Sequence, residues 1–112
     1  MIDSYTFGSF VVDGKKFDSN VSIINGVAKQ ARYLDDHLLL ESDFDKLIAA
    51  KPEIIIIGTG ASGVVRVQEE IKELIESNGI KLVIERTGEA CEIFNDLVKK
   101  GKKVCAFLHN TC

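Results

Sequence analysis

The sequence predicts an α/β fold in which antiparallel hairpins come first and a β-α-β-α-β unit follows. Three observations support this class. Asp13-Gly14 and Asn25-Gly26 separate β-prone runs, and such dipeptides suit the left-handed centres of a type I′ hairpin turn. From Ser42 onward the apolar residues recur at helical spacing. Four consecutive isoleucines, residues 54–57, indicate a strand that is buried on both faces, as in a parallel sheet.

The N-terminal third is expected to be β structure. Residues 5–12 and 15–17 flank the first turn signal, and residues 21–24 and 27–30 flank the second. Two hairpin signals in succession predict an antiparallel meander. Residues 37–40 are a candidate for one more short strand.

The first predicted helix begins at Ser42, whose hydroxyl is suited to capping. Apolar residues at helical spacing over 44–48 give this helix a face to bury. Pro52 ends it, because the residue before a proline avoids the helical region. The isoleucine strand is expected at residues 53–57.

The rest of the chain alternates helices and strands. An apolar stripe over residues 67–75 predicts a helix behind the glycines that follow the isoleucine strand. A strand is expected at 81–85, then a helix capped by Thr87 and stopped by Gly101, then a last strand at 104–108. Helical crossovers favour parallel strands. The pattern leaves the direction of the last strand open.

Length and charge narrow the classes of function. A chain of 112 residues is expected to be a single domain, with residues 1–40 as its hairpin part and residues 41–112 as its β/α part. A net charge of −3 disfavours a phosphate backbone, so no nucleic-acid role is expected. No apolar run approaches the ~20 residues of a membrane helix, and the first residues lack a signal-peptide pattern. We therefore expect a soluble, cytoplasmic protein that does not enter a membrane.

The glycine-rich stretch behind the isoleucine strand is the main candidate for a ligand site. Gly58, Gly60 and Gly63 match the spacing G-x-G-x-x-G, and Glu85 stands where an acidic residue would bind a ribose. The chain that follows is too short for the two halves of a full Rossmann domain. Three interpretations stay open: a tight strand-to-helix turn, a site for a small anion or metabolite, and a dinucleotide site.

Thr59 and Thr87 follow two strands that are expected to be parallel neighbours, so both turns should lie at one edge of the sheet. Helix N-termini that meet in such a crevice suit a small anionic ligand. Gly58, Thr59, Gly60 and Thr87 are therefore the candidate ligand cleft. The alternative for Thr87 is a helix cap alone.

Three side chains are candidate reactive groups. Cys91 is predicted in the first turn of a helix, where the helix dipole lowers a thiol pKa. His109 and Cys112 follow the last strand, where an imidazole and a thiol can pair. The alternatives are a buried core thiol for Cys91 and a solvated polar terminus for residues 109–112. The cysteines, which include Cys105, match no disulfide framework or zinc spacing, so reduced thiols and no metal site are expected. No cofactor is expected either.

Several short motifs along the chain resemble one known family. They are Gly8-Ser9 ahead of a hairpin, Gly-Thr-Gly at the end of residues 52–60, Thr-Gly-Glu-Ala at residues 87–90, and residues 101–106. Over essentially its whole length the chain resembles the small domain-of-unknown-function family of the adipogenesis-associated protein and the mitochondrial complex I assembly factor 3. The ending His109-x-Thr111-Cys112 resembles the archaeal stand-alone members.

The resemblance implies a three-layer α/β fold with a central mixed sheet and an additional β layer from the N-terminal hairpins. The family's eukaryotic members act in assembly or regulation through protein partners, so the resemblance implies such a role. No molecular activity is established for the family. The chain departs from its relatives in two places. It has no tryptophan near Ala31-Arg32, and it has Asn20 where relatives often have aspartate. It shows no mitochondrial targeting segment, so a role in complex I assembly is not carried over.

Two functions are compatible with these patterns. The first is a non-enzymatic interaction or assembly module that binds a protein partner or a second copy through its β layer or the cleft rim. The second is a protein that binds a small molecule or anion, or an enzyme, with its cleft at the Gly58–Gly60 and Thr87 turns. We favour the first, because the sequence contains no legible catalytic constellation.

Overall fold

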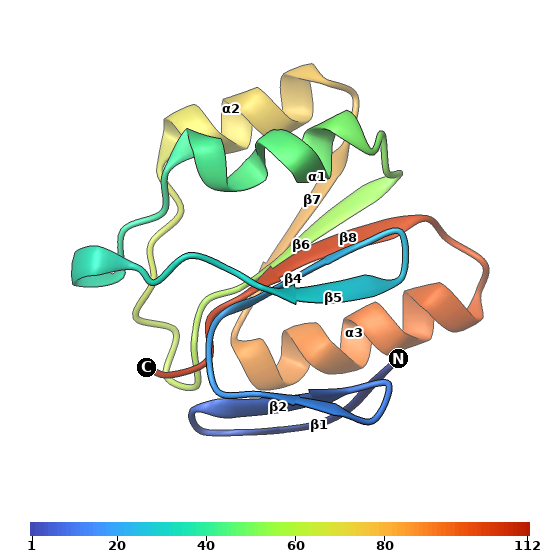
Figure 1. Ribbon diagram of the computed structural model, residues 1–112. Helices are drawn as coiled ribbons and strands as arrows, with labels where there is room; N and C mark the ends of the chain where they lie inside the picture. The colour runs from blue at the N-terminus through green and yellow to red at the C-terminus, as the bar shows by residue number, and fades with distance from the viewer.

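A mixed five-stranded sheet forms the centre of the molecule (Figure 1), and the computed structural model describes residues 1–112. Its strands are β4 (Val21–Ile24), β5 (Val27–Gln30), β6 (Ile54–Gly58), β7 (Lys81–Glu85) and β8 (Val104–Leu108). The strand order in the sheet is β5-β4-β8-β6-β7. β6 runs parallel to β7 and β8, whereas β4 is antiparallel to both β8 and β5.

Different layers cover the two faces of this sheet. One face packs against α3 (Thr87–Lys99) and an antiparallel sheet of β1 (Ile2–Thr6), β2 (Ser9–Val12) and β3 (Lys15–Phe17). The other face packs against α1 (Asp45–Ala49) and α2 (Glu69–Ser77), which lie together above the sheet in Figure 1. None of the helices has the length and apolar character needed to span a membrane. The predicted class, a mixed central sheet with an additional β layer, is confirmed.

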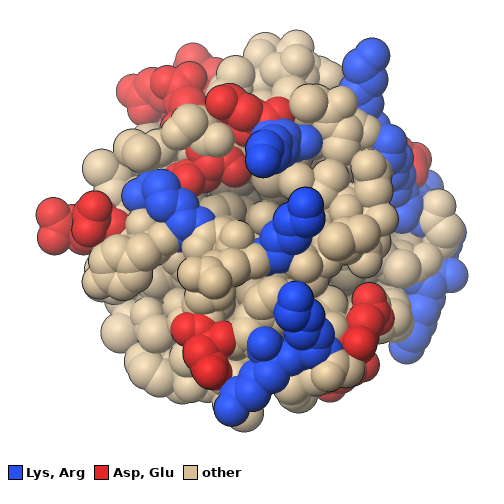
Figure 2. Space-filling view, viewed as in Figure 1, with Lys and Arg blue, Asp and Glu red and all other residues tan.

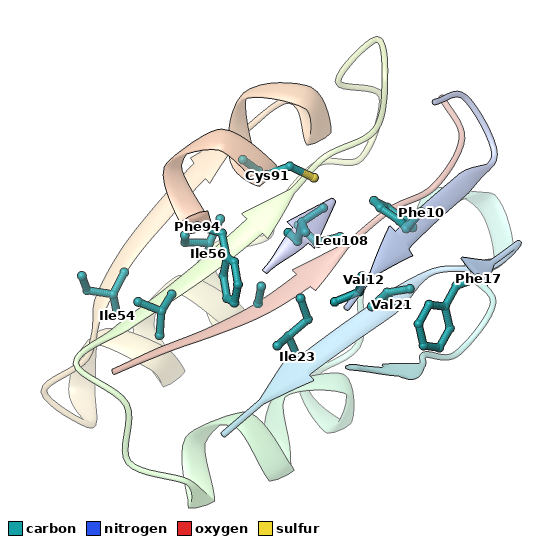
Figure 3. Packing of buried hydrophobic residues seen from close by; sticks show 14 residues of the cluster. Phe10, Val12, Phe17, Val21, Ile23, Ile54, Ile56, Cys91, Phe94 and Leu108 are labelled. Atoms are coloured by element: carbon teal, nitrogen blue, oxygen red, sulfur yellow. The ribbon is translucent and has the colours of Figure 1, made fainter. Parts of the chain in front are cut away.

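The isoleucine run explains why both faces must be covered. Ile54 and Ile56 belong to the cluster under α3 and the small sheet, and Ile55 and Ile57 belong to the cluster under α1 and α2. No isoleucine of the run is more than 7% exposed. Figure 3 shows Ile54 and Ile56 beside Phe94 of α3, within the first of these clusters. The predicted double burial is confirmed.

The expected single meander of residues 5–30 is wrong in two respects. Gly8, at φ +89°, turns the chain inside the run 5–12, which therefore forms two strands. The hairpins also separate, because β3 ends one sheet while β4 pairs with β8 in the other. Only residues 2–17 make the additional β layer. The turns at Asp13-Gly14 and Asn25-Gly26 have the predicted left-handed conformation at both centres.

The segment before α1 also differs from the prediction. Residues 37–40 form no strand: Asp35–His37 is a 3-10 turn, followed by a single backbone bridge between Leu38 and Arg66. Ser42 does not cap a helix. It lies within a 3-10 turn, and the Asp43 carboxylate accepts the Leu40 N–H instead, at 2.8 Å. The helix ends as expected before Pro52, with Lys51 in the left-handed region.

The helix expected directly behind the glycines begins only at Glu69. Residues 59–67 are irregular, because the stretch after Gly58 turns to meet other parts of the chain. In α3, Phe94 is buried as predicted but Val98 is 37% exposed. The last strand, whose direction the sequence left open, is parallel to β6. This direction brings the residues after β8 to the same edge of the sheet as the glycine turn.

Candidate functional site

Three parallel strands end at one edge of the central sheet, and Thr87 connects the segments that follow them. Its side chain is fully buried. Its hydroxyl accepts the Gly60 N–H at 2.8 Å and donates to the His109 carbonyl at 2.8 Å. Its own N–H donates to the Gly60 carbonyl at 3.1 Å. Thr87 is therefore not the helix cap that the sequence suggested, since its hydroxyl bonds across the sheet edge.

The glycine loop encloses the chain's own residues 111–112. The Ala61 N–H donates to the Thr111 carbonyl at 2.7 Å, and the Val64 N–H donates to the Cys112 backbone oxygen at 3.0 Å. The Ser62 N–H reaches the same Cys112 oxygen at 3.3 Å. The N–H groups that an anionic ligand would need are thus engaged. The loop also lacks a helix N-terminus, because α2 starts at Glu69.

Close approach of the chain explains two of the glycines. A Cβ on Gly58 would lie 2.9 Å from the Thr87 hydroxyl oxygen and 3.0 Å from a methyl carbon of Leu108. Gly60 has φ +107°, and a Cβ there would overlap the backbone of Cys112. Glycine is the residue that permits such approach and such a dihedral angle. These positions therefore have a structural reason that involves no ligand.

His109 lies beside Thr87 and the glycine loop, in a buried polar cluster. Its side chain is 5% exposed, and its Nδ1 is 2.9 Å from Oδ1 of Asn20. The Asn20 amide nitrogen donates to the Arg32 carbonyl at 3.0 Å, which orients Oδ1 toward the imidazole. Because an amide oxygen only accepts, Nδ1 carries the proton. Nε2 is then free to accept from the Thr111 hydroxyl, 3.3 Å away.

Burial lowers the pKa of His109, and the neighbouring His37 lowers it further. The two rings pack edge to face, with centroids 5.4 Å apart. The imidazole of the unfolded chain therefore binds a proton more readily than that of the folded chain. The contribution of His109 to stability is present above its ordinary pKa of 6.5, and it is lost as the pH falls through the lower pKa of the folded state. At neutral pH the cluster therefore contains an uncharged imidazole.

A hollow of about 310 Å³ opens on this cluster. It is lined mostly by polar side chains, among them His109, Asn20, Thr111 and Gln30, together with Ala31 and the ring of Tyr33. The Thr111 hydroxyl, the His109 imidazole and the Asn20 amide follow one another as hydrogen-bond partners. In this arrangement the imidazole can accept a proton from Thr111, or from the hydroxyl of a ligand that replaces Thr111. No group of three or more His, Cys, Asp or Glu side chains is arranged to hold a metal ion.

The predicted site residues divide into two groups. Gly58, Thr59, Gly60, Thr87, His109 and Cys112 all meet at the carboxyl edge of the sheet. Cys91 does not join them: Figure 3 shows it within the cluster on the inner side of α3. Burial, with a smaller effect of Glu92, raises the pKa of Cys91 to about 12, so its thiol stays protonated. No disulfide joins the three cysteines.

Two members of the cluster were missed from the sequence. The sequence marks Asn20 only as a departure from the family that the chain resembles. It marks His37 only as the start of a candidate strand. His37 and the preceding Asp36 have φ values of 57° and 52°, in the left-handed region. No local pattern identifies such a pair in advance. The departure at Asn20 was the one available signal.

We predict that Asn20→Asp raises the pKa of His109, because a carboxylate at 2.9 Å from Nδ1 favours the imidazolium. The pKa is measured by following the His109 ring signals in NMR spectra against pH. Asn25→Asp, the same change in an exposed turn of the β4–β5 hairpin, is the matched control and should leave the titration unchanged. An unchanged pKa in Asn20→Asp would contradict the described contact.

Comparisons with known proteins agree with this architecture. A family model described as a protein of unknown function, DUF498/DUF598, matches residues 2–109. A crystal structure of a conserved hypothetical protein from Pyrococcus horikoshii OT3 superposes with a TM-score of 0.88 at 26% identity, covering 100% of this chain and 99% of that chain.

Curated relatives carry the name of an assembly factor. NADH dehydrogenase (ubiquinone) 1 alpha subcomplex assembly factor 3 of Homo sapiens is 26% identical over 109 residues, which cover 96% of this chain. The Bos taurus protein of the same name is 28% identical over 109 residues, with the same coverage. The chain spans 59% of the length of these two relatives. The family resemblance inferred from the motifs is confirmed, and the chain belongs to the DUF498/DUF598 family.

Proposed function

We propose that this protein is a non-enzymatic interaction or assembly module that binds a protein partner through an exposed apolar rim. The rim comprises Tyr33, Leu38, Leu40 and Val64, from the two irregular segments on either side of the Leu38–Arg66 bridge. Exposed apolar side chains on two bridged segments are of the kind that a partner protein covers.

One observation carries this proposal. Eight large apolar side chains of the chain are exposed, and four of them belong to the rim. Tyr33 is 79% exposed, and the other three are between 43% and 48% exposed. Apolar side chains exposed singly are ordinary, but several on neighbouring segments are typical of binding surfaces.

The relatives and the thiols add two further supports. The curated relatives carry the name assembly factor, which describes work on other proteins. Cys91 and Cys105 are buried and unpaired, which suits a reducing compartment such as the cytoplasm. We therefore infer that the partner is another protein of that compartment.

The double variant Tyr33→Ser/Leu38→Ser should capture its partner at least about tenfold less well than the wild type, because truncating a covered apolar anchor costs about 2 kcal/mol or more. The tagged protein is incubated with extract of its source cells, and captured proteins are quantified by mass spectrometry.

The matched control is Phe7→Ser/Val98→Ser, which truncates exposed apolar side chains outside the rim. A partner retained by this control and lost by the rim variant supports the proposal. Equal capture by both variants would overturn it. Rim-dependent self-association in sedimentation experiments, with no other protein captured, would replace the partner with a second copy of the chain.

A second candidate function is binding of a small, uncharged hydroxyl compound in the hollow beside His109. The observation that favours it is a buried, neutral imidazole whose Nε2 acceptor has the Thr111 hydroxyl as its one hydrogen-bond partner, at 3.3 Å. The anionic ligand expected at Gly58, Thr59, Gly60 and Thr87 would instead have to displace residues 111–112 from the loop.

Native mass spectrometry tests this second candidate. Protein isolated under gentle conditions should retain a small mass that His109→Gln loses and Cys112→Ser keeps. A bare chain for wild type would remove the candidate, as would a mass that His109→Gln retains.

A further inference from the structure

We propose that the free edge of β5 binds an acidic, extended segment of a protein partner, which joins the central sheet as an additional strand. This inference rests on the proposed function in taking a protein as the partner. It concerns a different surface, however, since none of the four rim residues belongs to β5.

The backbone of β5 is available for pairing on one side. β5 ends the sheet and has β4 as its only neighbour. Ile24 and Val27 flank the two-residue turn as a hydrogen-bonded pair, so the next pair, Ile23 and Ala28, is of the non-hydrogen-bonded type. The alternation directs the N–H and C=O groups of Ala28 and Gln30 away from β4. These groups form the hydrogen-bonding ladder that another strand requires.

Lysine side chains line the hollows on both sides of this edge. A hollow of about 400 Å³ between β3 and β5 is lined by Lys15, Lys16 and Lys29. A second hollow, of about 430 Å³, is lined by Lys29 and by Lys46 of α1. Asp18 is the only carboxylate among the residues that line them. Figure 2 shows basic side chains in a line down the middle of the face that carries β5 in Figure 1.

These charges are largely uncompensated within the chain. Lys16 is 3.9 Å from Asp18, and both side chains are exposed, so their ion pair is weak. Lys29 and Lys46 form no ion pair. The two hollows along the β5 edge, called the β5 groove below, are therefore locally positive on a chain whose net charge is −3. Since the lysines lie on both sides of β5, the complementary strand has carboxylates on both of its faces.

Two other occupants fit less well. In a second copy, pairing of two β5 edges would bring Lys29 of each chain close together, and lysine on an edge strand opposes such pairing. For a single-stranded nucleic acid the β5 groove provides no exposed aromatic ring for base stacking, because Phe17 is only 7% exposed. The two-residue period of the free backbone groups matches a peptide.

A fluorescein-labelled octapeptide of glutamate and valine tests the proposal. Its fluorescence anisotropy should rise on titration with the protein, and the amide signals of Ala28 and Gln30 should shift in NMR spectra. Lys29→Glu should weaken binding at least about fivefold, because it replaces attraction by repulsion. Lys81→Glu, the same reversal on β7 at the opposite edge of the sheet, should leave binding unchanged.

Three results would overturn the proposal: no binding of the glutamate peptide, equal binding in Lys29→Glu and wild type, or equal binding of the same peptide with lysine in place of glutamate. Binding of octathymidylate with the same affinity, without shifts at Ala28 and Gln30, would also overturn it by identifying a general polyanion surface. Leu38→Ser should keep full peptide affinity. The peptide experiment therefore tests binding at the β5 edge independently of partner binding at the apolar rim.

Discussion

The hydroxyl of Thr87 is the contact on which the carboxyl edge of the sheet depends. It joins the first turn of α3 to the glycine loop after β6 and to the backbone after β8. With that backbone held, the Asn110 carbonyl accepts the Gly8 N–H at 2.7 Å and the Tyr5 hydroxyl at 3.0 Å, which ties the additional β layer to the central sheet. One buried side chain thus links α3 to the central sheet directly, and to the additional β layer through residues 109–110.

This arrangement gives the glycine loop a structural reason. The spacing G-x-G-x-x-G belongs in dinucleotide-binding proteins to a turn that opens a helix and leaves its N–H groups for a pyrophosphate. Here the loop precedes an irregular stretch, and its donors hold Thr111 and Cys112. The N–H donors of the loop are therefore used within the chain, so a ligand in this loop would have to compete with residues 111–112.

The parts of the fold that the sequence predicted correctly depend on local patterns. Asn25-Gly26 specifies its turn, and the isoleucine run at residues 54–57 favours a strand covered on both faces. The candidate site depends on contacts between distant residues. The bond from Thr87 to Gly60 spans 27 positions and that from His109 to Asn20 spans 89, and no periodicity encodes either. The edge that gathers these residues was predictable, but the partners of their polar atoms were not.

The free energies of unfolding of Thr87→Val and Thr87→Ser, measured in urea, test the central role of this hydroxyl most directly. Valine keeps the shape but leaves the Gly60 N–H and the His109 carbonyl without a partner, which predicts a loss of about 2–4 kcal/mol. Serine keeps the hydroxyl and removes one methyl group, which predicts a loss of about 1 kcal/mol. A valine variant as stable as the serine variant would contradict the account.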